Sequence, residues 1–234
     1  MKYIWASGTH VGRVRENNED TIFPASDGSS DTSVIVAVAD GMGGHAGGEI
    51  ASSTAMAAAT TGSGTPEERL LLANNTVLAK AATTPSLTGM GTTLTLARFT
   101  EDSTVEFAHV GDSRAYLLRE NQLTQITNDH TLVAEWVAAG AITPEEAKVH
   151  PRRGMLMKSL GVGLDVDVET HELSLVKGDR LMLCSDGLTG MVKDDVIASI
   201  LANSTPAAAV WELIEAANNS GGNDNVSVVV IEAD

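Results

Sequence analysis

The sequence predicts an antiparallel α+β fold: a four-layer α-β-β-α sandwich of two antiparallel sheets flanked by helix pairs, with a flap insertion. Strand-like segments dominate, and helical segments come in adjacent pairs instead of alternating with strands. The chain has 234 residues, 43% hydrophobic and 20% charged, which is enough for a globular core. We expect one domain over residues 1–234, with the flap at about 124–161.

Segments are predicted as strands where β-branched or alternating apolar residues lie between turn residues. These are residues 2–7, 20–24, 33–39, 91–98, 104–110, 113–118, 167–173, 180–184 and 226–232. The run at 33–39 is almost continuously apolar, which is typical of a strand buried on both faces. We expect a turn around residues 28–30, and a two-residue hairpin turn at Gly111-Asp112 between the strands on either side.

Helices are predicted where small or amphipathic residues run with no Gly or Pro after the first two positions. These are residues 47–60, 66–83, 129–139, 144–149, 194–201 and 206–218. The start of the second is the best defined, because Thr65 suits the N-cap and Pro66 the first helical position, with acidic residues following. The helices at 129–139 and 144–149 belong to the flap.

Charge and cysteine content exclude some classes of protein. A formal net charge of −16 argues against a nucleic-acid binder, which needs basic patches. The single cysteine, Cys184, forms no intramolecular disulfide and is read as a buried small residue, not a nucleophile. No signal peptide or bilayer-spanning run is evident. We therefore expect a soluble, cytoplasmic protein with no membrane or nucleic-acid partner, and take a monomer as the default.

Acidic residues cluster at turns that border apolar runs. Asp40, Asp112 and Asp186 follow such runs, and Asp224 precedes the last one. One Asp at a strand end carries little information, because Asp suits turns. Four of them, three beside glycine, predict that several segments converge on one site for a hard cation such as Mg²⁺ or Mn²⁺. Zinc is disfavoured, because the 6 histidines are scattered and there is no cysteine pair.

Two such cations about 3.5–4 Å apart can bridge a water, lower its pKa and clamp a transferring phosphoryl group. This chemistry needs a shared carboxylate, further acids on each side and a cationic group for the phosphate. Arg15, four residues before Glu19-Asp20, can supply that group. Its planar guanidinium can donate two hydrogen bonds to phosphate oxygens at once.

Short motifs in a fixed order carry a family resemblance. They are Arg15-Glu-Asn-Asn-Glu19-Asp20, Asp40-Gly41-Met-Gly-Gly-His45, Gly91-Thr-Thr93, Val110-Gly-Asp-Ser-Arg114, Cys184-Ser-Asp-Gly187 and Gly222-Asn-Asp-Asn225. Together, over residues 8–231, they resemble the metal-dependent serine/threonine protein phosphatases of type 2C, the PPM family, in its bacterial branch. The resemblance implies hydrolysis of phosphoserine and phosphothreonine by a metal-bridging hydroxide, with no phosphoenzyme.

The resemblance also implies cofactors: Mn²⁺ or Mg²⁺, two ions at the catalytic centre, with a third that bacterial members can bind. Asp40 would bridge the two metals and Gly41 would offer its carbonyl oxygen to one of them. Asp186 and Asp224 would complete the other. Asp112 together with Asp186 matches the pair for the third metal.

Other positions carry over from the family in the same way. Glu19 and Asp20 would act mainly through metal-bound waters, and Arg15 would hold the phosphate. Residues 124–161 match the family's variable flap. The implied partners are phosphorylated proteins, including Ser/Thr kinases and their substrates.

His45 is a candidate general acid for the leaving oxygen, because histidine has a suitable pKa. In eukaryotic members the histidine directly follows Asp-Gly, where Met42 stands here, so this role stays open. Two further departures are His10, where many bacterial members carry Asp, and Lys158, where Arg is common after the flap.

Several of the candidate site residues also have a purely structural interpretation. Asp112 could only form a turn, Asp20 could only accept structural hydrogen bonds, and Arg15 could pair with a surface acid. Arg114 is expected to pair internally and not with substrate.

Three other functions stay open at this stage. Gly41-Met-Gly43-Gly-His-Ala46 fits the dinucleotide fingerprint, but the acid expected about 20 residues later is missing. A pseudophosphatase would use the same pocket without turnover. A phosphatase for small molecules or for a partner-switching regulator would differ mainly in its flap.

Overall fold

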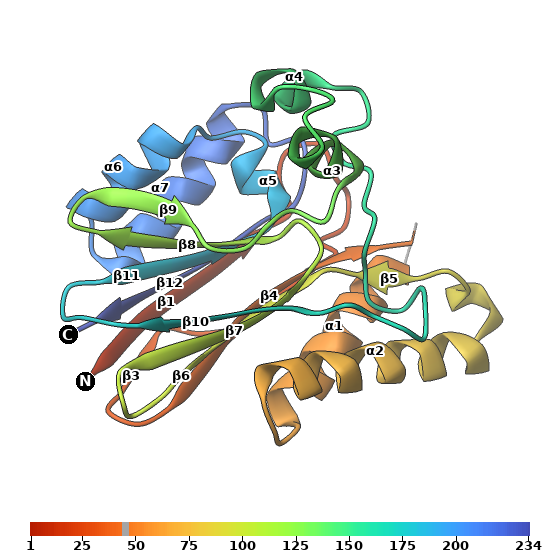
Figure 1. Ribbon diagram of the computed structural model, residues 1–234, viewed down its shortest axis with the longest axis horizontal. Coiled ribbons are helices and arrows are strands. Elements are labelled where there is room, and N and C mark those ends of the chain that lie inside the picture. Colours follow the sequence, from red (N-terminus) through yellow and green to blue (C-terminus); the bar gives the residue numbers. More distant parts are fainter. Residues whose placement is uncertain (44–46) are drawn as a thin grey trace.

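The computed structural model describes residues 1–43 and 47–234, and two antiparallel sheets form its centre (Figure 1). The first sheet has the order β3 (Gly28–Ser30), β1 (Tyr3–His10), β12 (Val226–Ala233), β11 (Arg180–Cys184), β8 (Arg114–Arg119) and β9 (Gln122–Gln125). The second has the order β10 (Glu169–Ser174), β7 (Thr104–Val110), β6 (Leu94–Phe99), β4 (Val34–Met42) and β2 (Asp20–Phe23). The short β5 (Gly91–Thr92) pairs with the end of β4.

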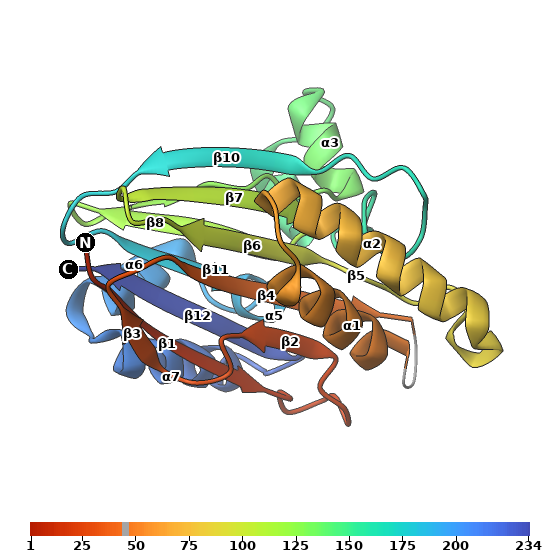
Figure 2. The ribbon, with the colours of Figure 1, turned by 90° about the horizontal axis from the view of Figure 1, so that it is seen from below.

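Helices cover the outer faces of both sheets, as Figures 1 and 2 show. The helices α1 (Gly47–Thr61) and α2 (Pro66–Thr83) pack on the second sheet, and a 3₁₀ turn follows at Pro85–Leu87. On the first sheet lie the short α5 (Asp186–Thr189), α6 (Asp194–Asn203) and α7 (Pro206–Asn219). The flap carries α3 (Leu132–Ala138) and α4 (Pro144–Val149). The predicted four-layer sandwich is confirmed.

Side chains alternate between two hydrophobic layers along each central strand. On β12, Val228 and Val230 pack toward the helices, whereas Val229 and Ile231 pack between the sheets. Alternation of this kind explains why the central strands read as continuous apolar runs: both faces are covered. Polar groups can therefore gather only where these strands end.

Local sequence signals placed several elements well. The helix predicted at 66–83 has these bounds in the structure, with a complete capping box between Thr65 and Glu68. Cys184 is fully buried, as predicted.

Two turn predictions are wrong, and both involve pairing between distant segments. Residues 28–30 form a strand, because they pair with Tyr3–Trp5 of β1. Gly111-Asp112 is not a hairpin turn: β7 belongs to one sheet and β8 to the other, so this segment crosses between the sheets. The structure also adds β9, which overlaps the expected start of the flap, and the short α5. The first flap helix starts at Leu132, not at 129, because Thr131 is its N-cap.

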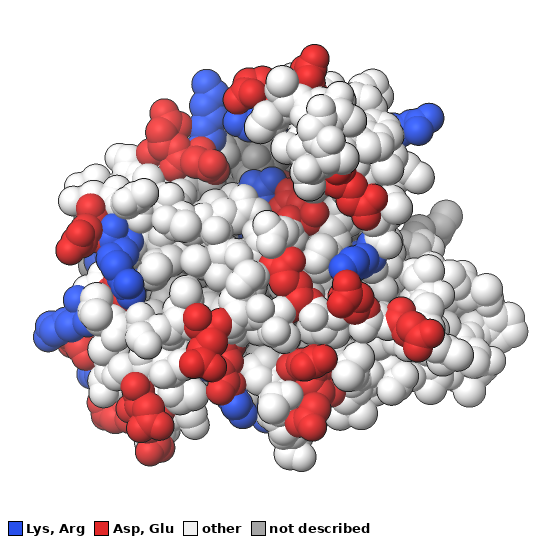
Figure 3. All heavy atoms as spheres, in the orientation of Figure 1, with Lys and Arg blue, Asp and Glu red and all other residues white. Residues whose placement is uncertain are grey.

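The surface carries many acidic side chains, as the formal net charge of −16 implies. Acidic side chains are spread over the face drawn in Figure 3, with Lys and Arg interspersed among them. Among the described helices, none is long and apolar enough to cross a membrane.

Thr65→Ala should lower the free energy of unfolding by about 1 kcal/mol, because it removes the N-cap acceptor of the Glu68 backbone N–H. Urea unfolding followed by circular dichroism measures this. Thr76→Ala in the same helix is the control: its hydroxyl only bonds back to the Leu72 carbonyl, and Ala is the better helix former. Equal losses in the two variants would contradict the capping argument.

Candidate active site

One end of the sandwich gathers the acidic residues singled out by the sequence. Asp40 lies near the end of β4 and Asp112 follows β7, while Asp186 follows β11 and Asp224 precedes β12. β4 and β7 both pair antiparallel with β6, so their ends point the same way. β11 and β12 pair antiparallel, so the end of one lies beside the start of the other. The two chain termini lie at the other end of the sandwich, where Tyr3 of β1 pairs with Ala233 of β12.

These residues open onto one cavity of about 430 Å³. The predicted site residues in its lining are Arg15, Glu19, Asp40, Gly41, Asp112, Asp186 and Asp224. Asn17, Met42, Gly43, Thr93 and Asn225 complete the wall on the sandwich side, and Gly154 and Leu156 of the flap line it as well. Of the predicted site residues that the structure describes, all except Asp20 line this cavity. His45 lies outside the described residues.

Asp20 lies behind the cavity, directly opposite Asp40 in the β2–β4 pairing. Its Oδ2 accepts a hydrogen bond from the Ser185 hydroxyl at 2.8 Å. The other oxygen, Oδ1, is buried and accepts no hydrogen bond within the described part of the protein. A buried carboxylate oxygen without a donor is costly, so Asp20 is more than a satisfied structural acceptor.

Burial and repulsion from neighbouring acids raise the pKa of the Asp20, Asp40 and Asp112 carboxyl groups. Burial, followed by the charges of Asp20 and Asp186, raises the pKa of Asp40 well above its usual range. Burial and then Asp186 raise the pKa of Asp112 to about 8. Burial raises the pKa of Asp20 to about 7, with Asp186 and Asp224 adding to the effect. The site thus carries more negative charge than its protein surroundings compensate.

Hard divalent cations fit this donor set. The groups are carboxylate and carbonyl oxygens, which Mg²⁺ and Mn²⁺ prefer, and they carry excess negative charge and an orphaned buried oxygen. Over residues 1–43 and 47–234, no three acidic, His or Cys side chains are already close enough to hold a metal ion by themselves. A bound cation would attract each carboxylate and so offset the repulsion among them.

Arg15 reaches into the same site. Its guanidinium donates to Oδ2 of Asp224 at 2.7 Å, although its side chain is 51% exposed. The ion pair expected from the structural interpretation is therefore present, but its partner is a cavity residue and not a remote surface acid. Arg15 itself lines the cavity, and its guanidinium has further N–H donors besides the one bonded to Asp224.

Asn225 holds the segment that carries Arg15 and Glu19. Its side-chain oxygen accepts from the Glu19 backbone N–H, and its side-chain N–H groups donate to the carbonyls of Val11 and Asn17. The sequence motif contained Asn225, yet sequence reasoning gave it no role. The only available signal was its place directly after Asp224.

Thr93 fixes the backbone of Asp40 in a similar way. The Asp40 N–H donates to the Thr93 hydroxyl, and the Thr93 N–H donates to the Asp40 carbonyl. Gly91-Thr-Thr93 was among the quoted motifs, again without a role. Glycine at position 41 has a steric reason: a Cβ there would lie 2.1 Å from the Gly48 carbonyl oxygen at the start of α1.

Two basic residues outside this constellation have partners of their own. Arg114 pairs with Asp129 through two hydrogen bonds, which confirms the expected internal role. Lys158, where the family commonly has Arg, pairs with Asp167 at 2.6 Å.

Comparisons with known proteins identify the family. A model of the family described as stage II sporulation protein E (SpoIIE) matches residues 30–234. The serine/threonine phosphatase stp of Listeria monocytogenes is 39% identical over 242 residues, which cover 97% of this chain and 94% of stp. The PPM Ser-Thr phosphatase MsPP of Mycobacterium smegmatis, solved in complex with cacodylate, superposes with a TM-score of 0.86 and 34% identity over 98% of both chains. The chain belongs to the PPM family of serine/threonine protein phosphatases.

A further PPM relative is the serine/threonine protein phosphatase PstP of Mycobacterium tuberculosis, 41% identical over 97% of this chain. The chain spans only 44% of the length of that protein. The catalytic domain of PstP, solved in complex with two manganese ions, superposes with a TM-score of 0.88 and 37% identity over 100% of both chains. Family membership confirms the resemblance and argues against the dinucleotide-binding alternative.

In chelator, the free energy of unfolding of this PPM domain should fall as pH rises from 6 to 9. The Asp112 carboxyl has a folded pKa near 8 and a lower unfolded pKa, so the folded state binds more protons in this window and loses stability on deprotonation. Asp112→Asn should flatten the pH dependence seen in urea titrations, whereas Asp102→Asn at an exposed position should not. An unchanged slope in Asp112→Asn would show that this carboxyl does not carry the effect.

Proposed function

We propose that this chain hydrolyses phosphoserine and phosphothreonine in proteins, in a metal-dependent reaction that opposes Ser/Thr protein kinases. Its partners would be phosphorylated proteins, including those kinases and their substrates. The observation that carries the proposal is the meeting of Asp40, Asp112, Asp186 and Asp224 with Arg15 around one cavity. The proposed compartment is the cytoplasm, with which the one free and buried cysteine is compatible.

Two Mn²⁺ or Mg²⁺ ions at the centre are part of the proposal, and the manganese complex of the PstP domain supports them. Asp40 and the Gly41 carbonyl would hold one ion. Asp186 and Asp224, together with Asp40, would hold the other. When bound, such ions activate water for direct hydrolysis and neutralise charge on the phosphoryl group.

The remaining residues would bind, orient or support. Glu19 and Asp20 would act through water, and Asp20 has an unpartnered oxygen available for this. Asp112 with Asp186 would hold a third ion. Arg15 would hold the phosphate: its guanidinium presents several donors, and only one of them is engaged by Asp224 in the described structure. His45 remains a proposed general acid.

Asp40→Asn should lower turnover of a phosphothreonine peptide with Mn²⁺ by more than about 100-fold. Loss of a residue that only supports a metal ligand costs up to about 100-fold, and Asp40 is proposed to contact both ions directly. The change keeps the shape but removes the charge that would be shared by both ions. Release of inorganic phosphate with EDTA, Mg²⁺ or Mn²⁺ measures it, with Asp102→Asn as the control. Folded wild-type protein that is inactive with every metal would favour a pseudophosphatase instead.

Arg15→Ala should raise KM for the phosphopeptide by about 10-fold or more, because a charge-assisted contact to phosphate contributes roughly 1.5–3 kcal/mol. Arg13→Ala is the matched control: Arg13 is two residues away, exposed, and donates to Asn219 outside the cavity. Steady-state kinetics on the same peptide compares the two. A KM effect of equal size in both variants would point to general charge and not to a phosphate contact.

A further inference from the structure

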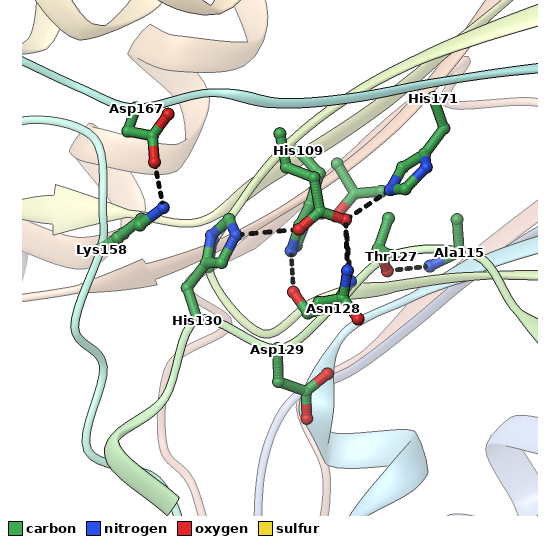
Figure 4. A network of polar contacts seen from close by, with 12 residues as sticks. His109, Ala115, Thr127, Asn128, Asp129, His130, Lys158, Asp167 and His171 are labelled. Carbon is green, nitrogen blue, oxygen red and sulfur yellow. Dashed lines mark hydrogen bonds and ion pairs between the residues drawn. The ribbon is translucent and has the colours of Figure 1, made fainter. Parts of the chain in front are cut away.

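His130 belongs to a network of polar side chains at the base of the flap (Figure 4), and it connects this network to the turn that carries Asp112. His130 follows β9 at the base of the flap, and its side chain is only 8% exposed. The network is separate from the residues that line the cavity, and sequence reasoning gave it no role. Its contacts link two parts of the active site that are distant in the sequence.

The His130 ring connects the Asp112 turn to β10. Its Nδ1 accepts the backbone N–H of Gly111 at 3.1 Å, so this nitrogen carries no proton. Nε2 therefore carries the ring proton and donates it to Oε2 of Glu169 at 3.2 Å. A backbone hydrogen bond also connects His130 to this turn, because the His130 N–H donates to the Gly111 carbonyl at 2.8 Å. Gly111 is thus held on both of its polar backbone groups by one residue.

The His130 backbone also holds the far side of the flap. Its carbonyl accepts the N–H of Met157 at 2.8 Å, and next to it Thr131 forms a β-bridge with Leu156. Leu156 lines the active-site cavity. One residue therefore contacts both the turn before Asp112 and the flap segment that forms part of the cavity wall.

Glu169 keeps the His130 ring in this orientation. Burial opposes ionisation of Glu169, but hydrogen bonds from His130, His171 and the Asn128 backbone N–H outweigh it and lower the pKa of this carboxyl. Glu169 is thus a charged acceptor whose two oxygens are divided between partners: His130 on Oε2, and His171 and Asn128 on Oε1. Figure 4 shows His130 and His171 on different sides of the network.

We propose that His130, oriented by Glu169, is a positioning residue that fixes the Asp112 turn and the cavity-facing flap segment at Leu156 and Met157 relative to each other. The proposal rests on the proposed function in so far as Asp112 serves a metal and the flap faces substrate. Loosening His130 would then weaken metal binding at Asp112 and substrate binding under the flap together.

Two substitutions separate the contacts of the ring. In His130→Asn, the side-chain oxygen is bonded to Cγ as Nδ1 is, so it can still accept the Gly111 N–H, while the contact to Glu169 is lost. In His130→Gln, the side-chain nitrogen can reach Glu169, but the amide oxygen is bonded to Cδ and not to Cγ, so it does not take the place of Nδ1 as the acceptor for Gly111. His171→Asn is the matched control, because His171 donates to the same carboxylate and, within the described residues, makes no hydrogen bond to the Asp112 turn.

The first measurement is amide hydrogen exchange of Gly111 and Met157 by NMR, in chelator and without substrate. We expect exchange at Gly111 to be about tenfold faster in His130→Gln, the size expected for one lost buried hydrogen bond, with a smaller effect in His130→Asn and none in His171→Asn. Met157 exchange should follow the same order. Unchanged exchange in His130→Gln, or equal changes in all three variants, would overturn the proposal.

The second measurement is Mn²⁺ binding by calorimetry, followed by phosphopeptide kinetics. His130→Gln should weaken the lowest-affinity Mn²⁺ site about tenfold and raise KM, with partial recovery in His130→Asn. Exchange is measured without metal or substrate, so it tests the positioning role even if the protein proves inactive. An inactive wild type with coupled exchange would count against the proposed function alone. Exchange that does not depend on His130 would count against the positioning role alone.

Discussion

The partial burial and mutual repulsion of the carboxylates at one end of the sandwich are the constraint on which the rest of the structure depends. Asp40, Asp112 and Asp186 have raised pKa values because burial and neighbouring acids disfavour their charged forms. Such groups do not assemble spontaneously; the surrounding structure has to hold them. The stability that holds them comes from the three hydrophobic layers along the central strands.

Hydrogen bonds at the strand ends fix the positions of the acidic residues. Thr93 fixes the backbone of Asp40, and Ser185 connects Asp20 to the first sheet while accepting the N–H of Ser227. Asn225 joins the segment before β2 to the start of β12. Each of these side chains links segments that are distant in the sequence, so the acids are held by several parts of the chain and not by one loop.

The parts of the fold that the sequence could predict are those with local causes. The helix at 66–83 is defined by its capping box, and β11 by a short apolar run between turn residues. The positions of the acids were predictable because Asp beside Gly marks a strand end. Partner choice between strands was not predictable, since it depends on contacts between distant residues. For this reason residues 28–30 read as a turn, and Gly111-Asp112 as a hairpin.

The error at Gly111-Asp112 explains what the site requires there. A hairpin would keep β7 and β8 in one sheet and leave Asp112 at an exposed tip. Because the chain instead crosses between the sheets, Asp112 lies in the interior with only 9% of its surface exposed, beside the ends of strands from both sheets. A crossing segment has no ladder of strand hydrogen bonds to fix it. Its backbone must therefore be held from outside, and the buried His130 supplies both an acceptor and a donor for Gly111.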